Sequence, residues 1–147
     1  SQWKVIEENL KIVDTRLTTT DNLVCVTVTP YNCLTLDRLL SWVLENYPNF
    51  SMHWFPAIAP KRSNLSLVPL ADRQLQVEKL KKLKPICSKD ISKNLDMIIK
   101  YLLKDDLNDQ QLINEFVEYA MLMDKIRKQN TLKMFPHLKS IFDRYKR

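Results

Sequence analysis

The sequence LVCVTVT at residues 23–29 decides the fold class, because it is the strongest strand signal in the chain. Side chains alternate along an extended chain, so the three valines would lie on one side and the cysteine and threonines on the other. Residues 51–55 and 65–68 are expected to add short extended pieces between prolines. Residues 1–70 therefore predict a small mixed α/β subdomain with short antiparallel strands and helices.

The segment before this strand has two competing signals. Trp3, Ile6, Leu10 and Val13 follow the spacing of one helical face. Residues 11–18 are also rich in β-branched side chains, which favour a strand. We expect a helix that changes to extended chain near Ile12, and the extended part would form a hairpin with residues 23–29.

Helical patterns follow on both sides of the proline-rich segment 48–70. Residues 36–47 form a broad apolar stripe after Thr35, a good N-cap. Further helices are expected at residues 71–84, from Ser88 or Ser92 to about residue 104, at 108–128, and from Thr131. The fold class is therefore α+β, in which residues 71–147 form a basic subdomain of three to four bundled helices. Both parts are expected to form one continuous globular unit.

The chain contains no glycine. Phosphate-binding loops and nucleophile elbows need glycine where the backbone turns with positive φ or approaches a ligand closely. This absence excludes those devices and favours binding over catalysis. We therefore expect a protein that is not an enzyme and uses no cofactor.

Three cysteines without a C-x-x-C spacing argue against a disulfide framework and favour a reducing compartment. No apolar run is long enough to cross a bilayer, so a membrane is not expected as a partner. The chain does not begin with Met, and we interpret it as a piece of a larger protein in the nucleus or cytoplasm.

The positive charge is confined to one half of the chain. Residues 1–74 carry equal numbers of acidic and basic side chains, so the whole net charge of +6 lies in residues 75–147. Lysine greatly outnumbers arginine there, which favours contact with phosphates or an acidic protein over the reading of bases. The candidate binding residues are Lys61, Arg62, Lys79, Lys81, Lys82, Lys84, Lys89, Lys93, Lys100 and Lys104. The alternative is that these cations only solvate amphipathic helices.

Few residues are candidates for catalysis or metal binding. His53 and His137 are not close in sequence to any cysteine, so the spacing predicts no metal site. Cys33 is the best candidate nucleophile, because a following helix dipole would lower its pKa. The acidic residues 105–109 are more simply a solvated link than a weak divalent-ion site. No catalytic residue is assigned.

Two apolar features are candidate protein interfaces. The aromatic segment 42–55 includes Trp54 and Phe55, which could fill the core, line a partner groove or stack on bases. The helix 108–128 is apolar around most of its circumference, and Met121 and Met123 would suit an adaptable interface. The other interpretation is that this helix is central and buried.

Three hypotheses follow. The first is a non-catalytic adaptor or scaffold module of a larger intracellular, nuclear assembly, which binds a protein through an apolar helix surface and a basic C-terminal face. The second is a domain that contacts the phosphate backbone of DNA or RNA through the C-terminal lysines. The third, an enzyme that uses Cys33 or scattered carboxylates, is the least favoured. The sequence leaves the oligomeric state open.

Overall fold

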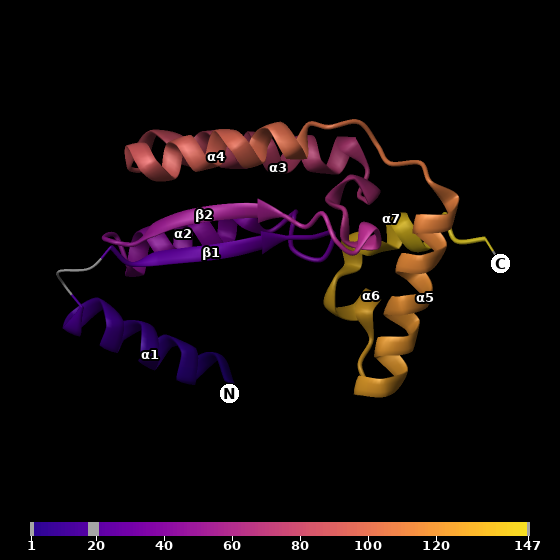
Figure 1. Ribbon diagram of the computed structural model, residues 1–147, viewed down its shortest axis with the longest axis horizontal. Coiled ribbons are helices and arrows are strands. Elements are labelled where there is room, and N and C mark those ends of the chain that lie inside the picture. Colours follow the sequence, from indigo (N-terminus) through magenta and orange to yellow (C-terminus); the bar gives the residue numbers. More distant parts are fainter. Residues whose placement is uncertain (1, 18–20, 147) are drawn as a thin grey trace.

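The structure is a computed structural model that describes residues 2–17 and 21–146 (Figure 1). It is a mixed α/β fold in which a two-stranded sheet is accompanied by helices. The strands are β1 (Leu23–Val28) and β2 (Ser51–Pro56). The α-helices are α1 (Gln2–Arg16), α2 (Leu36–Asn46), α3 (Leu70–Leu83), α4 (Lys89–Leu102), α5 (Gln110–Arg127), α6 (Thr131–Met134) and α7 (Lys139–Phe142). The 3₁₀ turns of the described residues are η1 (Lys61–Ser63), η2 (Leu65–Leu67), η3 (Lys84–Ile86) and η4 (Pro136–Leu138).

β1 and β2 are parallel, so the prediction of antiparallel strands is wrong. Val24 pairs with Met52 and Val26 pairs with Trp54. Parallel neighbours need a crossover connection, and the connection between β1 and β2 contains α2. The strands are thus the two ends of a β-α-β unit, and their carboxyl ends lie on the same side of the molecule.

α1 extends to Arg16, so the prediction that the chain becomes extended near Ile12 and forms a hairpin is wrong. The helical spacing of the apolar residues prevails over the β-branched composition, and Leu10 and Val13 of this face pack against the core. The ring of Trp3 lies 5.2 Å from that of Trp42 on α2, and Tyr47 Oη donates to the carbonyl of Glu7 (3.4 Å). Residue 18, the last of the expected strand, lies outside the described residues.

Two further segments differ from the prediction. The expected extended piece at 65–68 is instead the 3₁₀ turn η2, which begins where the Asn64 side chain accepts from the backbone N–H of Ser66. The expected last helix is divided into α6, η4 and α7. Pro136 starts η4, and because proline has no N–H it cannot continue the helical hydrogen bonds of α6.

The sheet is covered on one face. Val26, Val28, Met52 and Trp54 are buried on that side, whereas Phe55 on the other side is exposed. α4 packs against β2, and α3 packs against both α2 and α4. Figure 1 shows α3 and α4 running beside the strands, while α5, α6 and α7 lie beyond their carboxyl ends. The C-terminal helices are therefore arranged in two groups, and only the second group faces the strand ends.

Arg73 joins these two groups of helices. Its side chain is fully buried on α3, and Nε donates to the carbonyl of Val68 (2.7 Å). Nη1 donates to the carbonyls of Leu102 and Lys104, at the end of α4. Nη2 pairs with Asp106 (2.9 Å) in the link to α5. The guanidinium thus satisfies carbonyls that the end of α4 leaves without helical partners.

Candidate functional site

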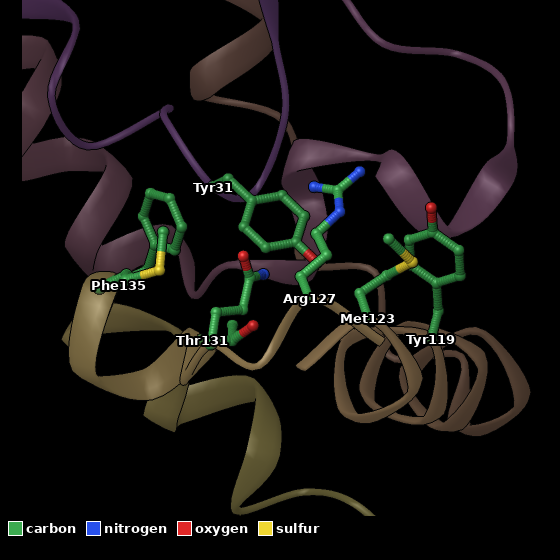
Figure 2. Close-up of a pocket in the computed structure, with 8 residues that line it drawn as sticks. Tyr31, Tyr119, Met123, Arg127, Thr131 and Phe135 are labelled. Carbon is green, nitrogen blue, oxygen red and sulfur yellow. The ribbon is translucent and has the colours of Figure 1, made fainter. Parts of the chain in front are cut away.

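A pocket lies at the carboxyl ends of the strands, between the loop that follows β1 and the helices α5 and α6 (Figure 2). Its volume is about 290 Å³, and most of its lining is apolar. In open α/β sheets, ligands bind in the crevice outside the carboxyl ends of the strands. The lining residues are Tyr31, Tyr119, Met123, Arg127, Gln129, Thr131, Met134 and Phe135. We call this cavity the strand-end pocket.

Tyr31 is held in the pocket by a stiff loop after β1. The Asn32 side chain accepts from the backbone N–H of Thr29 (2.9 Å) and donates to the carbonyl of Thr27 (2.9 Å). His137 Nε2 contacts the carbonyl of Pro30 at 2.9 Å, which joins this loop to η4. His137 therefore has a structural role beside the pocket, and the loop that carries Tyr31 is fixed from both sides.

Aromatic rings and charged groups meet at Tyr31. Its ring lies 5.3 Å from that of Phe135 in an edge-to-face arrangement. Burial raises the pKa of the Tyr31 hydroxyl above its usual value, and the neighbouring Tyr119 and Asp124 raise it further. Arg62 and Arg127 act in the opposite direction. The phenol therefore stays protonated at neutral pH and can donate a hydrogen bond.

Two guanidinium groups lie beside the pocket. Arg62, in η1 after β2, places its guanidinium carbon 4.3 Å from the centre of the Tyr119 ring, a cation–π contact. Figure 2 shows the Arg127 side chain extending past the ring of Tyr31. Neither arginine forms a salt bridge with any carboxylate in the described part of the chain. Both guanidiniums therefore retain donors for a ligand.

The end of α5 closes the pocket without glycine. Lys128 takes the left-handed conformation (φ 52°) in which helices usually end at glycine or asparagine. The carboxylate of Asp124 then accepts from the backbone N–H (2.9 Å) and hydroxyl (2.8 Å) of Thr131. This contact turns the chain back and brings α6 to the pocket.

α5 also has an apolar stripe on its outer side. Tyr119, Leu122, Met123 and Ile126 follow the spacing of one helical face. Leu122 and Ile126 are 52% and 63% exposed, and Tyr119 and Met123 also line the pocket. The inward side of α5 is formed by other residues, among them Phe116 and Ala120. We call these four residues the α5 stripe; it continues the pocket onto the surface.

The four predicted interface residues, Trp54, Phe55, Met121 and Met123, do not lie on one surface. Trp54 is 0% exposed and offers no surface to a partner. Phe55 is exposed on the open face of the sheet. Met123 lines the strand-end pocket, whereas Met121 is exposed on another side of α5. The structure thus places only Met123 of this set in the pocket.

The predicted basic residues are distributed over several elements. Lys79 and Lys82 are exposed on α3, Lys81 pairs with Glu78 (3.1 Å), and Lys84 pairs with Asp96 (2.6 Å). Lys104 lies over the ring of Tyr101 just after α4, at 4.1 Å from its centre. Lys61 is exposed beside Arg62, far along the chain from the other lysines.

Three of these lysines form a row on α4. Lys89, Lys93 and Lys100 are exposed, and their spacing puts them on the side opposite the buried Leu95 and Ile98. The row is about 16 Å long at the rise of an α-helix. None of the three forms a salt bridge with another described residue. We call them the α4 lysine row.

A second cavity of about 530 Å³, which is more polar than the strand-end pocket, lies at the other end of the strands. Ser51, His53 and Asp90 meet there: the Ser51 hydroxyl donates to the Asp90 carboxylate, and His53 Nε2 lies 3.3 Å from the same oxygen. The hydrogen bond from Ser51 is the main cause that lowers the pKa of Asp90, with a smaller contribution from His53. A serine triad needs the histidine between serine and carboxylate. Here the carboxylate is in the middle, so the serine is not activated as a nucleophile.

Cys33 does not fit the role of a nucleophile. It is fully buried, and desolvation raises the pKa of its thiol to about 12. The expected lowering of this pKa by a helix dipole is therefore wrong, because burial outweighs the dipole. Its Sγ lies 3.7 Å from the carbonyl of Pro30, in the loop that carries Tyr31.

The described residues contain no group of three His, Cys, Asp or Glu side chains that could hold a metal ion. None of the described helices has both the length and the apolarity to cross a membrane. Comparisons with protein-family models, curated proteins and solved structures found no match to this chain. The site must therefore be interpreted from its own chemistry.

Of the residues named from the sequence, Met123 lines the strand-end pocket and Arg62 lies over the ring of Tyr119, but the residues at the centre of the pocket were not named. Tyr31, Tyr119 and Phe135 were assigned to no site, although Tyr31 lies in the loop that follows the carboxyl end of β1, after Thr29 and Pro30. That position is where α/β proteins place ligand-binding residues, and it is the signal that could have identified Tyr31.

Proposed function

We propose that the chain is a non-catalytic interaction module of a larger assembly, and that it binds an acidic amphipathic helix of a protein partner along the α5 stripe. The observation that carries this proposal is the exposed apolar stripe on the outer side of α5. Its spacing of three and four residues matches the way one helix packs against another. Contiguous apolar surface of this kind is typical of an interaction site.

The charge around the stripe supports an acidic partner. Lys125, Arg127 and Lys128 surround Ile126 at the carboxyl end of α5, and Arg62 lies over Tyr119. The acidic side chains of this region are engaged within the chain: Asp124 binds Thr131, and Glu118 accepts from the Tyr145 hydroxyl (3.3 Å). A partner helix with acidic residues beside its apolar side would match this field.

A display selection tests the proposal. A library of 20-residue peptides is selected on the parent chain, and we expect enriched peptides with apolar residues at helical spacing and flanking Asp or Glu. A synthetic enriched peptide should lose at least about 100-fold in affinity for the double variant Leu122→Asp/Ile126→Asp, because two anchor positions are removed.

Met121→Asp is the matched control, since Met121 is also exposed on α5 but points about 100° away from Leu122. We expect it to bind the peptide as the parent does. The proposal fails if the selected peptides bind the double variant and the parent equally, or if they are basic. It also fails if sedimentation shows a dimer that Leu122→Asp dissociates, because a second copy would then occupy the stripe.

The α4 lysine row favours a second candidate function, contact with nucleic-acid phosphates. Lys89, Lys93 and Lys100 are aligned on the solvent side of one rigid helix. Lysines on such a surface bind the backbone of nucleic acid without reading its bases, and the affinity then falls steeply with salt. This function would use a different side of the molecule and is compatible with the first.

Fluorescence anisotropy with a labelled 20-base-pair DNA and a 20-nucleotide RNA tests this second function. Lys93→Glu/Lys100→Glu should weaken binding and reduce the slope of log affinity against log salt by about two. Lys133→Glu/Lys146→Glu makes the same charge change elsewhere and should leave that slope close to the parent value. Equal effects of the two double variants would show that only net charge matters, and would reject the row as a site.

A further inference from the structure

The strand-end pocket has the size and lining of a site for a small molecule rather than for a helix surface. Its volume of about 290 Å³ accommodates one or two fused rings and lies at the lower end of the range for ligand pockets. It is lined by the rings of Tyr31, Tyr119 and Phe135 and by the thioethers of Met123 and Met134. Such side chains contact the faces and edges of an aromatic ring favourably.

The polar groups around the pocket select a negative charge. Arg127 lines it, and Arg62 lies over the ring of Tyr119 that forms one of its walls. A guanidinium presents paired donors that match the two oxygens of a carboxylate or phosphate. Among the described carboxylates, that of Asp124 raises the pKa of Tyr31. This carboxylate already accepts hydrogen bonds from the backbone N–H and the hydroxyl of Thr131.

We propose that the strand-end pocket binds a free aromatic anion, a planar ring that carries a carboxylate or a phosphate. The ring lies among Tyr31, Tyr119 and Phe135, and the anionic group meets the guanidinium of Arg127, with Arg62 at the Tyr119 side. The hydroxyl of Tyr31 adds a neutral donor. The position fits as well, since Tyr31 lies in the loop after the carboxyl end of β1.

This inference does not rest on the proposed interaction with a helix. Leu122 and Ile126 do not line the pocket. The double variant Leu122→Asp/Ile126→Asp should therefore still bind an aromatic anion while it loses the selected peptide. Each proposal can fail without the other.

Three probes with the same ring and different charges test the inference: indole-3-acetate, indole and tryptamine. They are titrated into ¹⁵N-labelled protein, and amide shifts around Tyr31 and Thr131 are followed. We expect saturable shifts with indole-3-acetate, at least about tenfold weaker binding of indole, and no saturable binding of tryptamine.

Arg127→Gln should weaken binding of indole-3-acetate about tenfold or more, because it removes the charge-assisted contact. Lys125→Gln is the matched control, since it removes one positive charge from an exposed position of the same helix and should change the affinity less than twofold. The ¹⁵N spectrum of each variant verifies that it is folded.

Several outcomes would overturn the inference. Equal binding of indole and indole-3-acetate would show that charge is not recognised, and equal losses in the two variants would show only a general field. If an acidic peptide with one tryptophan shifts the same amides while the free probes do not, the pocket receives a side chain of a protein partner instead.

Discussion

α4 and α5 both follow the proline-rich segment, and each packs one side into the core: α4 through aliphatic side chains, and α5 through aliphatic side chains and Phe116. Their outer sides differ. On α4 the outer side carries the lysine row, whereas on α5 it carries the apolar stripe. The inward side of a surface helix is determined by packing, and its outer side is not. The two proposed interactions rest on this difference between the outer sides.

Arg73→Ala is expected to cause the largest loss, because this residue links the end of α4 to the connection with α5. Removing a fully buried guanidinium leaves the carbonyls of Leu102 and Lys104 without donors and should cost about 3–5 kcal/mol in the free energy of unfolding. Urea unfolding followed by circular dichroism measures this. If α3 and α4 unfold independently of α5, α6 and α7, the variant will instead show two unfolding transitions.

Lys79→Ala on the same helix is the control for Arg73. Lys79 is exposed, so we expect a change within about 0.5 kcal/mol. A similar small effect at Arg73 would contradict its role as the link between α4 and α5.

The second prediction compares the inner side of α4 with the outer side of α5. Leu95→Ala should reduce the free energy of unfolding by about 2–5 kcal/mol, because the side chain is fully buried and a cavity remains. Leu122→Ala should change it by less than about 0.5 kcal/mol, since Leu122 is half exposed. Thermal unfolding at low protein concentration measures both variants. If Leu122→Ala lowers the stability as much as Leu95→Ala does, the α5 stripe is already covered within the chain, and the proposed interface is rejected.

This contrast also shows which parts of the fold were predictable. α2 and α4 were found close to their observed bounds, because their apolar residues repeat with the period of a helix and their ends carry local signals such as Ser88. The direction of strand pairing was not predictable in the same way. Whether β2 runs parallel or antiparallel to β1 depends on how the connection through α2 packs against the sheet, and the residues of the strands do not determine that packing.

The candidate site was less predictable than the helices. The sequence indicated that α5 is apolar all round, but it could not separate Met121 from Met123, which only the packing of α5 does. The pocket combines Tyr31 with residues about a hundred positions later, and such contacts leave no local pattern. The burial of Trp54 and Cys33 and the pairing of Lys84 with Asp96 depend on tertiary contacts, which cannot be seen in a sequence.

The third prediction uses the different ends of the two helices. Leu103, which follows the end of α4, has negative φ, whereas Lys128, which follows the end of α5, has φ 52°. A side chain in the left-handed region costs about 1 kcal/mol, so Lys128→Gly should raise the free energy of unfolding by about 0.5–1 kcal/mol in urea titrations. Leu103→Gly should lower it, because glycine there only adds freedom to the unfolded chain. The opposite order would contradict the left-handed end of α5.

The smallest expected effect is a pH dependence at the start of α4. The pKa of Asp90 is lowered in the folded chain, chiefly by the hydrogen bond from Ser51, so folding is favoured when the carboxyl is ionised. That contribution is present above the pKa of an aspartate in the unfolded chain, about 3.9, and is lost as pH falls through the lower pKa of the folded state. Urea unfolding between pH 2 and pH 6 should therefore show a shallower acid decline for Asp90→Asn than for the parent.

Asp105→Asn is the control for Asp90. Asp105 is exposed in the link between α4 and α5, and no hydrogen bond from another described residue reaches its carboxylate. We expect its acid decline to match that of the parent chain. If both variants flatten the decline equally, the effect belongs to the general loss of negative charge at low pH. The Ser51–Asp90–His53 contacts would then not stabilise the start of α4, and the two helices would differ only in their outer sides.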